Sequence, residues 1–266
     1  MDIFGNQNKR AETLDGTEVP MNVLLKQEET KLSKKNAILI FLLYFIGFTW
    51  GLPFLIAILL SFLQSLNFLN DHMYDAQIII QMIGSIVFMI IIVILSKDLL
   101  KESYYAIRKN KLFLLLVIAV MYVFMLYSTG SVTTIVNMIT KADSSANQVE
   151  VVNLIIHYPY FAIFYVVVFA PIVEEIVFRG SIFRRLRTKY GFWLATGVSC
   201  LLFGFMHVML SLFTGNFLDL LNILVYGTMA FSLCAAYEIT GSIHASILMH
   251  LIHNSIATLV ILLGLS

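Results

Sequence analysis

Long apolar runs alternate with short polar connections along most of this sequence. The runs approach or exceed about 20 residues, the length that an α-helix needs to cross the hydrocarbon core of a bilayer. Backbone polar groups in lipid must be satisfied within the structure itself, so we expect an all-α bundle of membrane-spanning helices. About seven spans are predicted, with a range of six to eight, near residues 38–66, 76–96, 112–130, 151–178, 192–213, 219–239 and 243–264.

Prolines interrupt two of these runs. The first run contains Gly51-Leu52-Pro53, and the fourth contains Pro159 and Pro171. Proline lacks the N–H group of a helical hydrogen bond, and membrane helices tolerate it when a neighbouring group satisfies the freed carbonyl. We therefore expect kinked helices at these positions.

Composition supports a membrane protein. Hydrophobic residues make up 59% of the chain, charged residues 12%, and the mean hydropathy is +0.88, which excludes an ordinary soluble domain. The net charge of +1 gives no reason to expect a nucleic-acid partner. Residues 1–37 alternate charged and amide side chains without periodicity, so they predict a polar tail. The first apolar run is too long for a signal peptide and predicts a true span.

The positions of lysine and arginine predict the orientation. Six basic residues lie in the N-terminal tail, five in the connection at 97–111 and five at 179–189, so 16 of the 17 fall on one side of the bundle. Lys141 alone lies in the alternate connections. Since basic connections stay in the cytoplasm, we expect a multi-pass cell-membrane protein with a cytoplasmic N-terminus. Its predicted parts are the tail at 1–37, N-terminal transmembrane helices at 38–130 and a functional core at 145–264.

Three groups of polar residues lie inside the apolar runs. A charge at bilayer depth costs at least about 3 kcal/mol, so such residues usually face a protein interior or a wet cavity. Taken alone, each group has a structural explanation: carboxylates at the end of a span, a hydrogen-bonded core histidine, or a polar clamp between helices. The groups are Glu174-Glu175-x3-Arg179, Phe203-x3-His207 and His250-x3-Asn254.

The three groups are predicted to meet at one depth. Glu174 precedes Gly191 by 17 residues and His207 follows it by 16, so a hairpin turning at Gly191 places the two at the same level. If the 179–189 connection lies in the cytoplasm, both are roughly 7–10 Å below that surface, and the rise from the 242–243 break puts His250 near the same depth. The site is therefore expected in the cytoplasmic half of the bilayer.

Helical spacing predicts which side chains share a face. Glu174 points about 100° away from Glu175, so the two carboxylates should do different work. The pairs expected on one face are Glu175 with Arg179, Phe203 with His207, and His250 with Asn254.

Glutamate, two histidines and an asparagine suit the addition of water to a peptide carbonyl, in which a base takes a proton and donors hold the oxyanion. A zinc site is an alternative, because Glu174 or Glu175 with His207 and His250 would supply an ordinary His2Glu ligand set. The sequence has no His-Glu-x2-His helix, and it leaves both the zinc site and the need for any cofactor open.

In their order and flanks, the motifs resemble the CPBP family of intramembrane proteases, also labelled metalloproteases, which unites CAAX prenyl endopeptidases with bacterial Abi-type (bacteriocin self-immunity) proteins. The flanking residues that fit are Phe178-Arg179-Gly180 and 240–243. The resemblance covers roughly residues 145–260. It implies that Glu174 activates water with help from His207, that His250 and Asn254 stabilise the oxyanion, and that Glu175, Arg179 and Phe203 support them.

The resemblance implies a bacterial endopeptidase whose partners are the lipid bilayer and a small peptide or membrane-protein substrate, in bacteriocin self-immunity or peptide-signal maturation. The alternative is a non-catalytic immunity or scaffold protein that binds a peptide or membrane partner. A transporter with a proton relay should show an inverted repeat of broken helices, and we find none in the sequence.

The remaining cysteines and histidines are assigned no catalytic role. Cys200 and Cys234 lie in apolar runs, where a small buried side chain is the ordinary case. His253 follows His250 closely enough to lie near the site, and His244 departs from the family pattern. His72 and His157 are predicted on the outer side.

Overall fold

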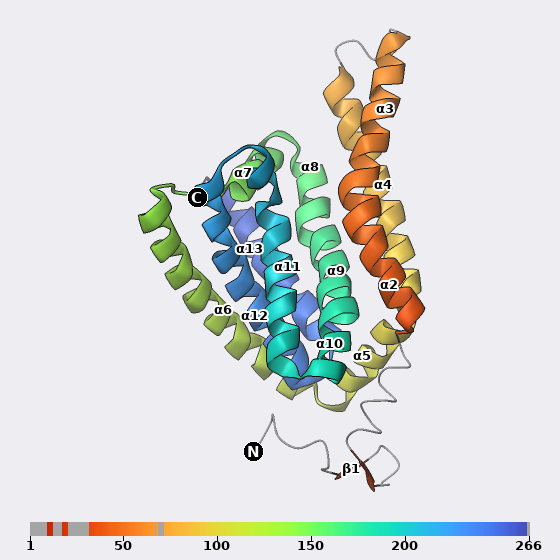
Figure 1. The fold of residues 1–266 in the computed structure, drawn as a ribbon, viewed down its shortest axis with the longest axis vertical. Helices are drawn as coiled ribbons and strands as arrows, with labels where there is room; N and C mark the ends of the chain where they lie inside the picture. The colour runs from red at the N-terminus through yellow and green to blue at the C-terminus, as the bar shows by residue number, and fades with distance from the viewer. Residues whose placement is uncertain (1–9, 13–17, 21–31, 67, 69–71, 265–266) are drawn as a thin grey trace.

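The computed structural model describes residues 10–12, 18–20, 32–66, 68 and 72–264, and nearly all of them are helical (Figure 1). Seven helices are long and apolar enough to cross a membrane, which confirms the predicted all-α, multi-pass bundle. They are Lys34–Ser65, Met73–Leu95, Lys111–Thr140, Pro159–Tyr190, Phe192–Phe213, Phe217–Thr240 and Ile243–Leu262.

Several spans are built from consecutive helical segments. The first comprises α2 (Lys34–Leu42), the π-helix η1 (Leu43–Gly51) and α3 (Leu52–Ser65). The fourth comprises α8 (Pro159–Ala162), the π-helix η3 (Ile163–Phe169), α9 (Ala170–Glu175), the π-helix η4 (Ile176–Phe183) and α10 (Arg184–Tyr190). The others are α4 (Met73–Leu95), α6 (Lys111–Thr140), α11 (Phe192–Phe213), the 3-10 turn η5 (Phe217–Leu221) with α12 (Asn222–Thr240), and α13 (Ile243–Leu262). Two shorter helices, α5 (Lys97–Lys109) and α7 (Ala146–His157), connect spans.

The first helix begins at Lys34, a few residues before the predicted 38. Ser33 caps it, because its Oγ accepts a hydrogen bond from the Asn36 N–H at 3.1 Å. Within the predicted tail, β1 (Arg10–Glu12) and β2 (Glu18–Pro20) pair as a short antiparallel ladder. The rest of the tail before residue 32 lies outside the described residues.

The third span is longer than predicted, since α6 continues from 130 to Thr140. Residues 131–140 include several hydroxyl side chains, so the apolar run in the sequence ended at 130 and the predicted span was too short. Ser131 Oγ and Thr134 Oγ1 donate to carbonyls one turn earlier, at 2.8 and 2.9 Å. These bonds satisfy the hydroxyls within the helix and let it continue.

The fourth predicted span, 151–178, is not one continuous helix in the structure. It breaks at Tyr158, where α7 ends, and Pro159 begins the next helix at a position that needs no N–H donor. That helix then continues through the predicted 179–189 connection to Tyr190 and ends at Gly191, whose φ is 85°. Arg179 has no exposed surface, so it belongs to the span and not to a cytoplasmic connection.

In the bundle, α12 packs against α6, α11 and α13, while the α3–α4 hairpin extends to one side (Figure 1). A buried core cluster lies mainly between α2, η1, α9, η4, α11 and α12. At its centre, Phe178 makes edge-to-face contacts with Tyr44 and Phe203, at ring distances of 5.8 and 5.2 Å. This aromatic layer lies directly beside the helix that contains both glutamates.

Candidate active site

Helix α9 holds the two glutamates between two π-helical segments. In η3 the hydrogen bonds reach five residues back, as from the Ala170 N–H to the Tyr165 carbonyl. The next bond in this series would join residue 171 to the Val166 carbonyl, but Pro171 has no N–H. Asn254 Nδ2 on α13 donates to the Val166 carbonyl instead, at 2.8 Å. A predicted site residue thus satisfies the carbonyl that proline leaves free.

The two glutamates face different surroundings. Glu175 has no exposed surface, and its Oε1 accepts from Arg179 Nη1 at 2.8 Å and from His250 Nδ1 at 3.0 Å. Arg179 also donates to the Ala230 carbonyl at 3.0 Å. Glu174 instead lines a cavity, and its Oε2 lies 4.0 Å from His250 Nε2. The predicted Glu175–Arg179 pair is therefore present, and the neighbouring carboxylates occupy different environments.

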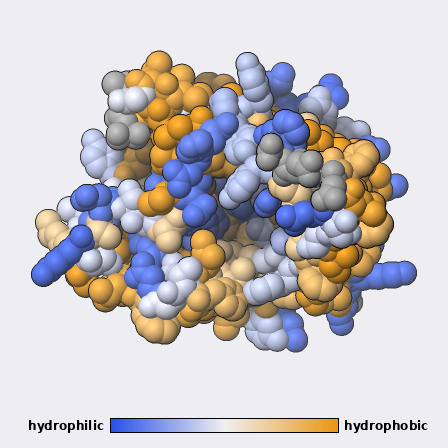
Figure 2. Space-filling view, turned by 90° about the horizontal axis from the view of Figure 1, so that it is seen from above, coloured by the Kyte–Doolittle hydropathy of each residue, from blue (hydrophilic) through white to orange (hydrophobic). Residues whose placement is uncertain are grey.

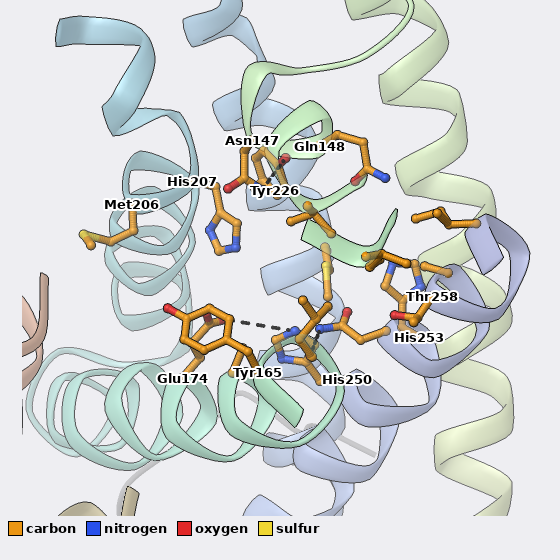
Figure 3. A pocket seen from close by; sticks show the side chains of 18 of the residues that line it. Asn147, Gln148, Tyr165, Glu174, Met206, His207, Tyr226, His250, His253 and Thr258 are labelled. Carbon is orange, nitrogen blue, oxygen red and sulfur yellow. Dashed lines mark hydrogen bonds and ion pairs between the residues drawn. The ribbon is translucent and has the colours of Figure 1, made fainter. Parts of the chain in front are cut away.

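A cavity of about 270 Å³ lies between α9, α11, α12, α13 and α7. Figure 3 shows Glu174, His207 and His250 directed toward it from three different helices. Asn254 lines the same cavity, so the structure brings together all four residues that the motifs predict for catalysis. Glu174, His207 and His250 are 33 or more positions apart in the sequence and meet here because the spans pack side by side.

Both histidines use one ring nitrogen within the protein. His207 Nδ1 lies 2.8 Å from the Phe203 carbonyl, to which it donates, so in the neutral ring Nε2 is the free acceptor. The His207 ring packs between Phe203 and Tyr226, each with a centroid distance of 4.4 Å. His250 Nδ1 donates to Glu175, which leaves its Nε2 toward Glu174. The predicted contact of Phe203 with His207 is present.

Anchored histidines beside a carboxylate are also typical of zinc sites, so the donor chemistry suits the metal. The geometry does not fit it, because among the described residues no three His, Cys, Asp or Glu side chains lie close enough together to hold an ion. We therefore describe the site's chemistry through its own side chains.

Tyrosines complete the cavity wall, and no motif in the sequence identified them. Tyr165 lies beside Glu174, and Tyr226 stacks on His207 (Figure 3). The Tyr226 hydroxyl also hydrogen-bonds Ser145 Oγ at 2.8 Å and accepts from Asn147 Nδ2 at 3.1 Å. It thereby links His207 to the start of α7, which lies more than 60 residues earlier in the sequence.

Among the other histidines, His253 lines the cavity, whereas His72 and His157 lie in contacts away from it. Cys200 and Cys234 are free thiols.

Comparison with known protein families finds a match that covers the predicted catalytic residues of this site. The family described as type II CAAX prenyl endopeptidase Rce1-like matches residues 156–256, which include all three motifs. Over these residues the chain is similar to the CPBP/CAAX protease family. The CAAX-type segment begins in α7 and ends within α13, so it contains most of the cavity wall.

A curated relative is similar over a longer stretch. "Putative membrane peptidase YdiL" from Bacillus subtilis (strain 168) is 25% identical over 187 residues, which cover 70% of this chain and 72% of the relative. No solved structure matches the chain. The matched family is described as an endopeptidase and the relative is named a membrane peptidase, so both similarities are to proteins described as peptidases.

Proposed function

We propose that this protein is an intramembrane endopeptidase in which Glu174 activates the water that hydrolyses a peptide bond. The main support is the convergence of Glu174, His207, His250 and Asn254 on one cavity inside a helix bundle. Ionisable groups inside a membrane protein are costly, and those that face a cavity mark a functional site.

In the proposed reaction, Glu174 takes a proton from water as the water oxygen bonds to the scissile carbonyl carbon. His207 positions this water through Nε2, because its Nδ1–H is already donated to the Phe203 carbonyl. The carbonyl becomes a tetrahedral oxyanion. The C–N bond then breaks, and the proton on Glu174 moves to the leaving amine, which regenerates the carboxylate.

The oxyanion is held by His250 and Asn254. His250 gives its Nδ1–H to Glu175, so it donates from Nε2 when the ring is protonated on both nitrogens. The Asn254 amide has two hydrogens; one is donated to the Val166 carbonyl, and the second remains for the oxyanion. Glu175 and Arg179 act as positioning residues, since they fix the His250 ring.

The proposed setting is the cell membrane of a bacterium, with the N-terminus and the basic connections in the cytoplasm. The proposed substrate is a small peptide or a membrane-associated protein, in bacteriocin self-immunity or peptide-signal maturation. A non-catalytic immunity or scaffold protein that binds such a partner is the alternative.

Replacing Glu174 by glutamine separates these functions, because glutamine has nearly the same shape but cannot take the proton. We expect Glu174→Gln to lower cleavage at least about 100-fold at normal membrane levels. Glu150→Gln, on the exposed face of α7, is the matched control and should behave like the wild type. The measurement is a comparison of new peptide termini in cells that produce each variant. Products that persist with Glu174→Gln would contradict the protease and favour the non-catalytic alternative.

A further inference from the structure

We infer that substrate enters the catalytic cavity from the membrane face opposite the basic connections, through a second, polar cavity beside α7. If the proposed proteolysis is correct, its substrate is then a peptide segment exposed on the non-cytoplasmic side.

Below the catalytic residues, toward the basic connections, the bundle is closed. Glu174 and His250 lie above a layer of side chains with no exposed surface, which comprises Val177, Phe178, Arg179, Phe203, Ile243 and Met249. Helix α5 closes the bundle further down, where Ser242 Oγ donates to the Ser103 carbonyl at 3.0 Å. None of these residues lines the cavity, so the described part of the chain leaves a peptide no open route from this side.

Above the catalytic residues, a second cavity of about 220 Å³ adjoins the first. Gln148, Tyr226, Met229 and His253 line both cavities and therefore form the boundary between them. The second cavity extends past the end of α6 to residues 143–145 and to Asn222. Its outer residues, Asp143 and Ser144, are exposed.

The lining of the second cavity suits a peptide backbone. Asn137, Ser144, Gln148 and Asn222 supply donors and acceptors along it. Thr129 Oγ1 also lines it and is buried with no hydrogen-bond partner among the described residues. A buried polar group of this kind gains from a ligand that brings its own amide groups. An isoprenoid chain would bring none, so the lining favours a polar, extended peptide.

The face on which this cavity opens is fixed by the fold. In Figure 1, α7 lies at the upper end of the core, whereas α5 and α10, which are rich in basic residues, lie at the lower end. Figure 2 views the upper face, where hydrophilic side chains gather around a central hollow between hydrophobic flanks. Because basic connections mark the cytoplasm, the hollow faces the other side.

Cysteine labelling tests this route without any knowledge of the substrate. Single cysteines are introduced into a Cys200→Ala/Cys234→Ala background, and a sulfonated, membrane-impermeant maleimide is added to right-side-out or inverted vesicles. Ser144→Cys reports on the second cavity and Ala257→Cys on the catalytic cavity. Lys189→Cys marks the basic side, and Ala195→Cys, at a position with no exposed surface, reports loss of folding.

We expect Ser144→Cys and Ala257→Cys to react at least tenfold faster in right-side-out vesicles, Lys189→Cys to react faster in inverted vesicles, and Ala195→Cys to react in neither. Reaction of Ala257→Cys only in inverted vesicles, or in neither preparation while Ala195→Cys stays protected, would overturn the inference. Labelling does not require cleavage and can be repeated in a Glu174→Gln background. The labelling can therefore disprove the entry route without disproving the proposed protease, and loss of the protease proposal leaves the test of the route intact.

Discussion

At the scale of single residues, adjacent glutamates have opposite relations to the cavity. Glu174 lines it, whereas Glu175 is enclosed between Arg179 and His250. The helical spacing predicted the Glu175–Arg179 pair, because residues four apart share a face. The depth argument brought His250 to the level of the glutamates, but it did not predict the bond from His250 to Glu175, since helical rise does not say which carboxylate the ring faces.

The Glu175–Arg179 pair provides a test of burial. Glu175→Gln leaves the Arg179 guanidinium without its counter-charge in a site with no exposed surface, so we expect the free energy of unfolding to fall by about 3–5 kcal/mol. Glu238→Gln is the matched control, because Glu238 pairs with Arg187 at 2.7 Å but both side chains retain exposure. Its effect should stay within about 1 kcal/mol. Denaturant unfolding in detergent measures both, and equal losses would show that burial does not govern the pair.

At the scale of helical elements, the unusual geometry of α9 explains one of the site residues. The sequence predicted a kink at Pro171 and a neighbour that satisfies the freed carbonyl. Asn254 is that neighbour, which agrees with the polar clamp between helices that the sequence offered beside the oxyanion role. Its two proposed tasks, bracing the helix and binding the oxyanion, can be separated.

Pro171→Ala separates them, because alanine restores an N–H opposite the Val166 carbonyl. In the wild-type background, Asn254→Ala should lower stability by about 1–3 kcal/mol, the cost of an unsatisfied buried carbonyl. In the Pro171→Ala background this loss should be much smaller. If Asn254 also donates to the oxyanion, cleavage should still fall about 100-fold there. Stability that responds identically in both backgrounds would exclude the bracing role, and full activity of the double variant would exclude the oxyanion role.

Gly204 lies at a close contact between α11 and α12. A Cβ atom at Gly204 would lie 2.6 Å from the Ile223 carbonyl oxygen, so Gly204→Ala must move one helix backbone. We expect a loss of about 1–3 kcal/mol and a shift of His207, which lies one turn away on α11. Gly197→Ala on the same helix meets nothing within 4 Å and should be tolerated. Thermal unfolding in detergent compares the two, and similar midpoints would show that the helices adjust freely.

At the scale of the whole molecule, the sequence predicted the seven spans well but did not separate the short helix α7 from the fourth span. The hairpin at Gly191 places Glu174 and His207 together as expected. The turn between α12 and α13 lies deeper than Gly191, because Ile243 lies against Gly180, where a Cβ atom would be 3.3 Å from Ile243 Cδ1. This deeper turn lets His250 reach Glu174 after few residues. Helix α7 was not separated in the sequence, because its apolar residues continue directly into the next span.

The requirement for a metal also concerns the whole molecule, because an ion would join side chains from three helices. His207 and His250 each retain Nε2 for a ligand, and Glu174 is nearby, yet these groups do not come close enough together to hold an ion. Activation of water by Glu174 does not require these three groups to lie within bonding distance of one ion. Asn254 is a poor zinc ligand but a good neutral hydrogen-bond donor. We expect the purified protein to cleave peptide after exhaustive chelation and to contain substoichiometric zinc by elemental analysis. One tightly held zinc per protein, with activity that is lost on chelation and restored by zinc, would instead make the histidines ligands.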